Sequence, residues 1–463
     1  MRTVYRSVPL LLICLLALIQ CQSPSSGSSG ADDIGTTKAD SLPGWMKDAV
    51  IYEVNVRQYT PEGTFAAFRR HLPRLKEMGV KTLWFMPVYP VSQVKRKGSL
   101  GSYYAVGNTR EVNPAFGSME EFRQLVREIH SMGMYVILDW VPNHTGWDHP
   151  WIAEHPEYYT HDPVTDTIVH PANTDWYDVA DLNYDQPGLT EAMIGEMAYW
   201  VKEVGIDGFR CDMAGMVPVS FWEEATPALL SLKSDLFLLA ETMDPPLRNE
   251  QLFHADYGWA FKDLANGICQ GQKTIADLNT YLNKDSATYR SGAHLYFTSN
   301  HDENSWHGTE FERLGKGAEA MYILAATLPG IPLIYSGQEE PLQKRLLFFE
   351  KDDIGFKTFG YAGFYQRLNQ LKQVNSAVYS PPYGGVLTIL SPSNPSTFAY
   401  TRENGDDRLL VVVNLSDQAQ ETRIDIGDWN GTYRDIFRGT QQALANPMTL
   451  QIGPWGYMVL SNR

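Results

Sequence analysis

Three acidic residues, Asp212, Glu241 and Asp302, stand at or just beyond the ends of apolar segments of this chain. Each apolar segment predicts a buried β-strand, so the three carboxyl groups are expected together at one end of a sheet. Burying a carboxylate costs several kcal/mol unless it is paired or hydrogen-bonded. Three of them at one place are hard to explain as structural residues, and they indicate acid–base or nucleophilic chemistry.

A guanidinium lies two residues before the first of these carboxyl groups. Because side chains alternate along a strand, Arg210 is expected on the same side as Asp212, where it would keep Asp212 ionised as a nucleophile requires. Glu241 is flanked by Ala240 and Thr242, without an adjacent cation, which suits a carboxyl of raised pKa that acts first as acid and then as base. Cleavage of a glycosidic bond with retention needs such a pair, with about 5 Å between the carboxyl groups.

A regular alternation of helices and strands positions these residues. Amphipathic segments at 64–78 and 189–204, and a third that Ser118 and Glu121 begin as a capping box, are each followed by a glycine and an apolar strand. Strand segments lie near residues 50, 82, 135, 208, 236, 254, 294 and 332, the sixth being the weakest. Eight such strands predict a (β/α)8 TIM barrel, whose active site lies at the carboxyl ends of its strands.

The composition divides the chain into parts. Residues 45–375 are expected to form the catalytic barrel, and the long segment at about 145–187, rich in Pro, Asp, His and aromatic residues, an inserted subdomain. Short strands separated by turn residues follow at 376–463 and predict an all-β C-terminal sandwich domain.

The N-terminus has the pattern of a targeting segment. Arg2 and Arg6 precede an apolar stretch too short to span a bilayer, and Cys21 and a Ser/Gly-rich stretch follow. Residues 1–21 therefore predict a signal peptide of the bacterial lipoprotein type with Cys21 lipidated, and residues 22–44 a flexible linker. We expect an exported protein of the cell envelope, periplasmic or attached to the outer membrane, with simple secretion as the alternative.

Charge and cysteine content narrow the function classes. The net charge of −16 argues against a nucleic-acid partner, which would favour a basic stripe, and fits a neutral substrate. Two of the four cysteines lie in the targeting segment, so only Cys211 and Cys269 remain, too few for a disulfide framework. No Cys or His spacing typical of a transition-metal site is present, and no organic cofactor is expected.

Several segments together resemble the short sequence regions of the α-amylase family, glycoside hydrolase family 13. The resemblance covers about residues 45–463 and keeps the family's order along the barrel strands. The matching segments are Asp139-Trp-Val-Pro-Asn-His144, Gly208-Phe-Arg-Cys-Asp212, Ala240-Glu241, Ser299-Asn-His-Asp302, Asp181-Leu-Asn183 and Gly101-Ser-Tyr-Tyr104.

This resemblance implies a role for each residue. Asp212 would attack the substrate to form a β-glucosyl-enzyme, and Glu241 would protonate the leaving group and then activate water. Asp302, His144 and His301 would hold hydroxyls of the distorted sugar, with Arg210 orienting Asp212. Tyr104 would stack on the same sugar. Trp147, Trp151, Trp176 and Trp306 lie in or near rim loops, where sugar stacking and loop packing are both open interpretations.

The resemblance also raises structural calcium. Asn143 is the candidate ligand, with a plain turn residue as the alternative. Many family members carry Lys-His where this chain has Gly215 and Met216, and the His carbonyl of that pair often binds calcium. Calcium is therefore left open, and acceptor preference with it.

The resulting hypothesis is a retaining hydrolase of α-1,4-glucosidic bonds in starch, maltooligosaccharides or cyclodextrins, acting within chains or at their ends. The first alternative is a transglycosylase of the same family, such as a 4-α-glucanotransferase, which shares the covalent intermediate. The second is a non-catalytic surface glucan-binding protein, against which the intact carboxylate set speaks.

Overall fold

The computed structural model describes residues 38–463. The predicted signal peptide, Cys21 and most of the predicted linker lie outside the described residues. The folded unit begins earlier than the predicted residue 45, because Ala39 and Leu42 are buried and the Ala39 N–H donates to the Gln251 carbonyl over 2.8 Å. Within residues 38–463, no helix has the length and apolar character needed to cross a membrane.

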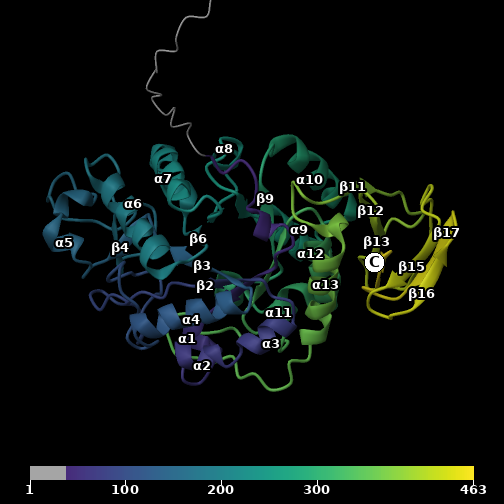
Figure 1. Ribbon diagram of the computed structural model, residues 1–463, viewed down its shortest axis with the longest axis horizontal. Coiled ribbons are helices and arrows are strands. Elements are labelled where there is room, and N and C mark those ends of the chain that lie inside the picture. The colour runs from purple at the N-terminus through teal and green to yellow at the C-terminus, as the bar shows by residue number, and fades with distance from the viewer. Residues whose placement is uncertain (1–37) are drawn as a thin grey trace, which may run out of the picture. The chain divides into compact units, whose positions relative to one another are not determined.

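Eight parallel strands close into a barrel, as the sequence predicts, in the order β1-β10-β9-β8-β7-β6-β3-β2 (Figure 1). The weak sixth segment is confirmed as a strand, β8. The bounds are β1 (Ile51–Val54), β2 (Thr82–Phe85), β3 (Tyr135–Trp140), β6 (Gly208–Cys211), β7 (Phe237–Ala240), β8 (Ala255–Tyr257), β9 (Ala293–Tyr296) and β10 (Ile331–Tyr335).

The barrel strands are apolar on both faces because both faces are covered. Ile51, Trp84 and Ile137 pack in a cluster formed largely by side chains of the barrel strands, whereas Tyr52 and Leu83 belong to the larger cluster that includes the surrounding helices. Alternation along each strand sends neighbouring residues to opposite faces. This explains the near-continuous apolar runs in the sequence.

The helices follow the predicted order with one interruption. The segment predicted as one helix at 64–78 is two, α2 (Phe65–Arg69) and α3 (Leu72–Glu77), with Pro73 in the first turn of α3. Proline cannot donate to the carbonyl four residues earlier, so an unbroken helix is excluded there. The capping box of Ser118 and Glu121 is confirmed at the start of α4 (Met119–Ser131).

The segment at 189–204 forms α6 (Leu189–Tyr199) and continues as one π-helical stretch, η3 (Trp200–Val204). The other helices are α1 (Val56–Tyr59), α5 (Trp151–Glu154), α7 (Val219–Leu232), α8 (Pro245–Asn249), α9 (Trp259–Cys269), α10 (Ile275–Thr288), α11 (Glu310–Leu314), α12 (Ala318–Thr327) and α13 (Ala362–Val374). A second π-helical turn, η5 (Glu303–His307), follows β9.

The segment after β3 leaves the barrel and returns through a small antiparallel pair, β4 (His144–Gly146) and β5 (Val179–Asp181). This pairing sets His144 opposite Asp181 and joins the two ends of the predicted inserted subdomain. The intervening residues are therefore anchored at the carboxyl end of β3, beside the predicted site.

The C-terminal domain is all-β, as predicted. A six-stranded antiparallel sheet has the order β11-β12-β13-β18-β15-β16, and a two-stranded sheet pairs β14 with β17. Apolar side chains of the two sheets pack in one cluster, so the domain is a sandwich. The bounds are β11 (Val386–Ile389), β12 (Thr397–Asn404), β13 (Asp407–Asn414), β14 (Gln420–Ile424), β15 (Gly431–Asp435), β16 (Gln441–Leu444), β17 (Met448–Ile452) and β18 (Tyr457–Ser461).

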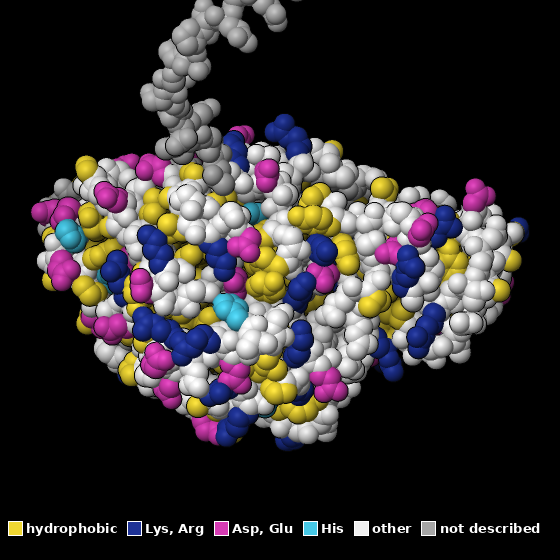
Figure 2. All heavy atoms as spheres, in the orientation of Figure 1, with side chains coloured by type: hydrophobic (Ala, Val, Ile, Leu, Met, Phe, Trp, Pro, Cys, Tyr) yellow, Lys and Arg dark blue, Asp and Glu magenta, His cyan; other side chains and the backbone are white. Residues whose placement is uncertain are grey.

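Figure 1 shows this domain in yellow beside α12 and α13. Two buried polar contacts join it to the barrel. The hydroxyls of Thr327 and Tyr400 lie 2.5 Å apart, and the Arg402 guanidinium donates to the carbonyls of Thr327 (3.1 Å) and Tyr379 (3.0 Å). On the face that Figure 2 presents, basic and acidic side chains are interspersed with apolar ones.

Candidate active site

A cavity of about 490 Å³ lies at the carboxyl ends of the barrel strands. Asp212 follows β6, Glu241 follows β7, and His301 and Asp302 follow β9. These side chains line the cavity together with Tyr104 and His144, whereas Arg210 lies fully buried within β6. The structure therefore brings the predicted site residues together from five parts of the chain.

Arg210 joins three carboxyl groups. Its Nη1 lies 2.9 Å from both Asp139 Oδ1 and Asp212 Oδ1, and its Nη2 lies 2.7 Å from Glu241 Oε1. Its Nε donates to the Tyr257 hydroxyl over 2.9 Å. The absence of a cation beside Glu241 in the sequence was therefore misleading, because the cation comes from the neighbouring strand.

The register of β6 and β7 explains why Asp212 and Glu241 meet at Arg210. β6 and β7 pair in parallel with Cys211 opposite Ala240, so the residues that follow them, Asp212 and Glu241, leave the barrel side by side. The Glu241 N–H donates to the Cys211 carbonyl over 3.0 Å, which continues the ladder one residue past β7. Two consecutive barrel strands thus place one carboxyl each against the same guanidinium.

Burial raises the pKa of both carboxyl groups, but to different values. It raises the pKa of Glu241 to about 8, against the opposing charge of Arg210. Burial also raises the pKa of Asp212, to about 6, again opposed by Arg210. We expected Arg210 to keep Asp212 ionised; the guanidinium does lower the pKa of Asp212, but desolvation is the larger effect. Near pH 7 Asp212 is still mostly ionised while Glu241 mostly keeps its proton, which is the division that an acid and a nucleophile need.

His301 sits between two carboxylates and a tyrosine. Its Nδ1 lies 2.5 Å from Glu53 Oε1, and its Nε2 lies 2.8 Å from the Tyr104 hydroxyl and 3.4 Å from Asp302 Oδ2. Burial acts to lower the pKa of His301, but Asp302 and Glu53 outweigh burial and raise it to about 9. Tyr104 also donates to Asp139 Oδ2 over 3.1 Å, which ties this group to Arg210. His301 is therefore a buried imidazolium at neutral pH.

His144, at the start of β4, carries no charge. Burial lowers its pKa to about 4, so a neutral ring faces the cavity. Its Nδ1 lies 3.3 Å from Asn143 Nδ2, and the centroid of the Trp176 ring lies 5.7 Å from its own. A neutral imidazole can hydrogen-bond a sugar hydroxyl without adding charge.

Comparison with known proteins identifies the family and the fold of the chain. The family model described as alpha amylase, catalytic domain, matches residues 37–179 and 172–354. The chain belongs to the α-amylase family. A second model, described as maltogenic amylase, C-terminal domain, matches residues 387–459.

Relatives of this α-amylase family member span several activities. The "Maltogenic alpha-amylase" of Bacillus acidopullulyticus is 24% identical, with 90% of this chain and 78% of the relative covered. "Alpha-amylase 3" of Dictyoglomus thermophilum is 26% identical over 64% of each chain. "Alpha-1,4-glucan:maltose-1-phosphate maltosyltransferase 1" of Streptomyces coelicolor is 27% identical, with 77% of this chain covered and 56% of the relative. The chain thus spans less than two thirds of the length of two of these three relatives.

Solved structures match over nearly their whole length. The noncanonic maltogenic α-amylase AmyB from Thermotoga neapolitana has a TM-score of 0.81 at 26% identity, covering 90% of this chain and 99% of that one. An α-amylase from Lactobacillus plantarum has a TM-score of 0.80 at 26% identity, covering 90% and 100%. Barrel and C-terminal sandwich therefore occur together in both.

Calcium at Asn143, which the resemblance leaves open, stays a prediction. The Asn143 backbone carbonyl accepts the Leu182 N–H over 3.2 Å, and its side-chain nitrogen faces His144. Within residues 38–463, no three His, Cys, Asp or Glu side chains gather as a metal cluster. The residues present do not fit a carboxylate-rich calcium site here, and no catalytic step below uses one.

Glu53 is among the polar residues of this α-amylase family site that sequence reasoning missed. Glu53 on β1 is fully buried and holds His301, and its Oε2 has no hydrogen-bond partner in the structure. Its signal was available, since it is the one charged residue inside the otherwise apolar strand at 50–54. A carboxyl group inside a barrel strand requires a partner of opposite charge.

The rim tryptophans divide into two groups. Trp176 and Trp306 line the cavity, together with Tyr177, Phe348 and Phe349. The other two do not line it: the Trp147 Nε1–H donates to the Tyr177 carbonyl over 2.9 Å, and Trp151, the first residue of α5, is buried against other aromatic rings. Only the first pair is placed to meet a sugar.

Proposed function

We propose that this member of the α-amylase family is a retaining hydrolase of α-1,4-glucosidic bonds in starch, maltooligosaccharides or cyclodextrins. The observation that carries the proposal is the pair Asp212 and Glu241, bound to one guanidinium but with pKa values of about 6 and about 8. Contact with the same guanidinium supports a short separation, suited to retention at about 5–5.5 Å rather than inversion at about 6.5–9.5 Å.

In the proposed first step, an Asp212 carboxylate oxygen attacks the anomeric carbon while Glu241 gives its proton to the glycosidic oxygen. The bond from the anomeric carbon to that oxygen breaks, and the shortened glucan leaves with a free hydroxyl. In the second step Glu241, now ionised, takes a proton from water, and the water oxygen attacks the anomeric carbon. The bond to Asp212 breaks, and both carboxyl groups return to their starting states.

The charged groups around the pair suit this sequence. Asp302 and His301 would hold hydroxyls of the sugar as its ring distorts, and neutral His144 would hold another. After the first step Glu241 is an anion, and the Arg210 Nη2 at 2.7 Å is placed to stabilise it until it takes the proton from water. Arg210 thus serves both halves of the reaction.

The test is time-resolved product analysis on maltoheptaose with the mature domain and its Asp212→Asn variant. Shorter maltooligosaccharides from the wild type, with an inert variant, would support hydrolysis. If neither protein acts but both bind glucan, the enzyme proposal fails and a glucan-binding protein takes its place.

Transglycosylation is the second candidate, favoured by the relatives named maltosyltransferases. It uses the same covalent intermediate but lets a sugar hydroxyl, not water, attack it. Products longer than maltoheptaose in the same experiment would assign this activity, with the same residues in the same roles.

A further inference from the structure

We propose that the enzyme acts at the non-reducing ends of linear α-glucans, because a loop closes the side of the cavity that would receive the rest of the glycone. The proposal rests on the proposed function and decides between action within chains and action at ends. The loop is residues 93–101, between β2 and α4, and is called the rim bridge below.

One end of the rim bridge is bonded to the loop that follows β10. The Leu100 N–H donates to the Phe349 carbonyl over 2.9 Å, and the Ser99 N–H donates to Glu350 Oε1 over the same distance. The Ser99 hydroxyl donates to the same carboxylate. Two loops from strands on either side of β1 are thereby joined above the barrel.

A buried arginine fixes this junction from below. Arg57 Nη1 donates to the Gly101 carbonyl over 2.9 Å and to the Phe348 carbonyl over 3.1 Å, so one side chain holds a carbonyl of each loop. Its guanidinium also lies 3.8 Å from the Tyr103 ring centroid. Hydrogen bonds from a buried charge to carbonyls are among the stronger ones in proteins.

The middle of the rim bridge, at Lys97, is bonded to the inserted subdomain. Lys97 Nζ donates to the Asp175 carbonyl over 2.8 Å and lies 3.2 Å from Asp178 Oδ1. It also sits 4.6 Å from the centroid of the Tyr177 ring. The rim bridge therefore forms one continuous wall from the inserted subdomain to the β10 loop.

Aromatic side chains add a second layer to the wall on the side that faces the active-site cavity. The Phe348 ring stacks on Tyr104 at 6.3 Å between centroids and 13° between planes. Trp306, on the π-helical turn after β9, packs on Phe348 at 5.1 Å and on Phe349 at 5.7 Å. The wall thus reaches from β3 through β2 and β10 to β9.

Barrel order shows which end of the substrate meets this wall. β2 and β10 are the neighbours of β1, and β7 lies four strands from β1 in either direction. Glu241 follows β7, so the acid that protonates the leaving group stands across the barrel from the wall. The leaving part of the glucan extends toward Glu241, and the glycone, which ends at the non-reducing terminus, extends toward the wall.

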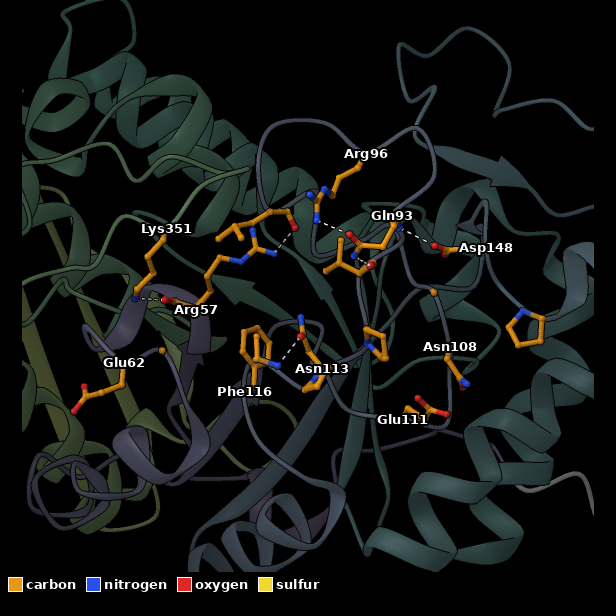
Figure 3. A pocket seen from close by; sticks show the side chains of 18 of the residues that line it. Arg57, Glu62, Gln93, Arg96, Asn108, Glu111, Asn113, Phe116, Asp148 and Lys351 are labelled. Atoms are coloured by element: carbon orange, nitrogen blue, oxygen red, sulfur yellow. Dashed lines mark hydrogen bonds between the residues drawn. The ribbon is translucent and has the colours of Figure 1, made fainter.

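The rim bridge separates two cavities and is not part of the packed core. A second cavity of about 740 Å³ lies on its outer side, lined by Gln93, Arg96 and Leu100 of the bridge. Figure 3 looks into this second cavity and shows Arg96 bonded to Gln93 above it, with Arg57 on its far side. Neighbouring residues of the bridge thus face different spaces: Lys97 lines the active-site cavity and Arg96 the outer one.

A chain can therefore place only a short glycone beyond the cleaved bond. A non-reducing end fits against the wall, whereas an internal segment would have to pass through it. Cyclodextrins, which have no end, are expected to be poor substrates. The product is expected to be one short saccharide of fixed length.

The test compares 4-nitrophenyl maltoheptaoside with the same compound blocked at its non-reducing glucose by a 4,6-O-ethylidene group. The wild type should release one short product from the free substrate and cleave the blocked one about 100-fold more slowly, the scale of a misplaced substrate. The double variant Lys97→Ala/Glu350→Ala removes one side-chain bond from the rim bridge to the inserted subdomain and another to the β10 loop. It should gain activity on the blocked substrate and release mixed lengths. Arg96→Ala is the matched control and should behave as the wild type.

Equal rates on the two substrates, with mixed product lengths from the wild type, would overturn the proposal and leave the proposed function intact. A wild type inactive on both substrates would overturn the proposed function and this inference with it. The wild-type comparison decides the question even if the double variant does not fold.

Discussion

The substitution Glu53→Gln removes the negative charge of a side chain at the centre of the site while keeping its size and shape. The amide matches the carboxyl in size and can still accept a hydrogen bond from His301 Nδ1, now 2.5 Å from Glu53 Oε1. What disappears is the negative charge that helps to keep His301 protonated. Glu53 is fully buried and lies beneath the cavity, so it acts through His301 as a positioning residue.

The structure sets the size of the effect. The pKa of His301 is about 9 against an ordinary value of about 6.5. At 1.36 kcal/mol per pKa unit this difference is about 3 kcal/mol in favour of the imidazolium. Burial opposes it, and Asp302 and Glu53 supply it. Removing one of two contributors is expected to lower the pKa by about one to two units and kcat/KM at pH 8 by about two- to tenfold.

The assay is the pH profile of kcat/KM on maltoheptaose. A raised histidine pKa means that the charged form is present at low pH and lost as pH rises through that pKa. Glu241 sets the basic limb near pH 8 in the wild type, and Glu53→Gln should move this limb to lower pH because His301 then loses its proton at or below that pH, with the smallest loss of rate at acidic pH. Glu53→Asp, which keeps the charge, should retain the basic limb even where its rate is lower. A uniform loss at all pH values in Glu53→Gln would refute the reasoning and make Glu53 a packing residue only.

Three further predictions follow from the site and the termini. The wild-type profile should be bell-shaped, falling below pH about 6 as Asp212 is protonated and above pH about 8 as Glu241 loses its proton; limbs near the ordinary carboxyl values would contradict this. Dialysis against a chelator should change neither Tm nor activity, and a clear loss restored by calcium would revive Asn143 as a ligand. Cys21→Ser should move the protein from the membrane fraction to the soluble fraction of its host, and unchanged fractionation would argue against lipidation.

The barrel could be predicted from the sequence because it consists of a local pattern repeated eight times. Apolar runs, glycine stops and a capping box each depend on a few adjacent residues, and all eight strands were found. The carboxylates were found for the same reason, since each follows its own strand. Proline was the exception: Pro73 divides a helix that periodicity alone would have continued.

Contacts between distant segments were beyond such reasoning. Arg210 meets Glu241 only through the register of β6 and β7, and Glu53 meets His301 across 248 positions of sequence. The rise in the pKa of Asp212 has no signal in the adjacent residues, because burial, which depends on every neighbour, exceeds the effect of one adjacent cation. The wall formed by the rim bridge, with partners at 175–178 and 348–350, has no signature in any single segment.

The contacts of Arg402 give the C-terminal sandwich a part in the synthesis of the enzyme. A ribosome synthesises the barrel before the sandwich. The Thr327 carbonyl on α12 therefore lacks its hydrogen-bond donor until Arg402, 75 residues later in the chain, has been translated. Until then the last barrel helices present an uncovered apolar and polar face. The boundary near residue 375 therefore separates two parts that share buried hydrogen bonds, and those bonds form only after β12 has been made.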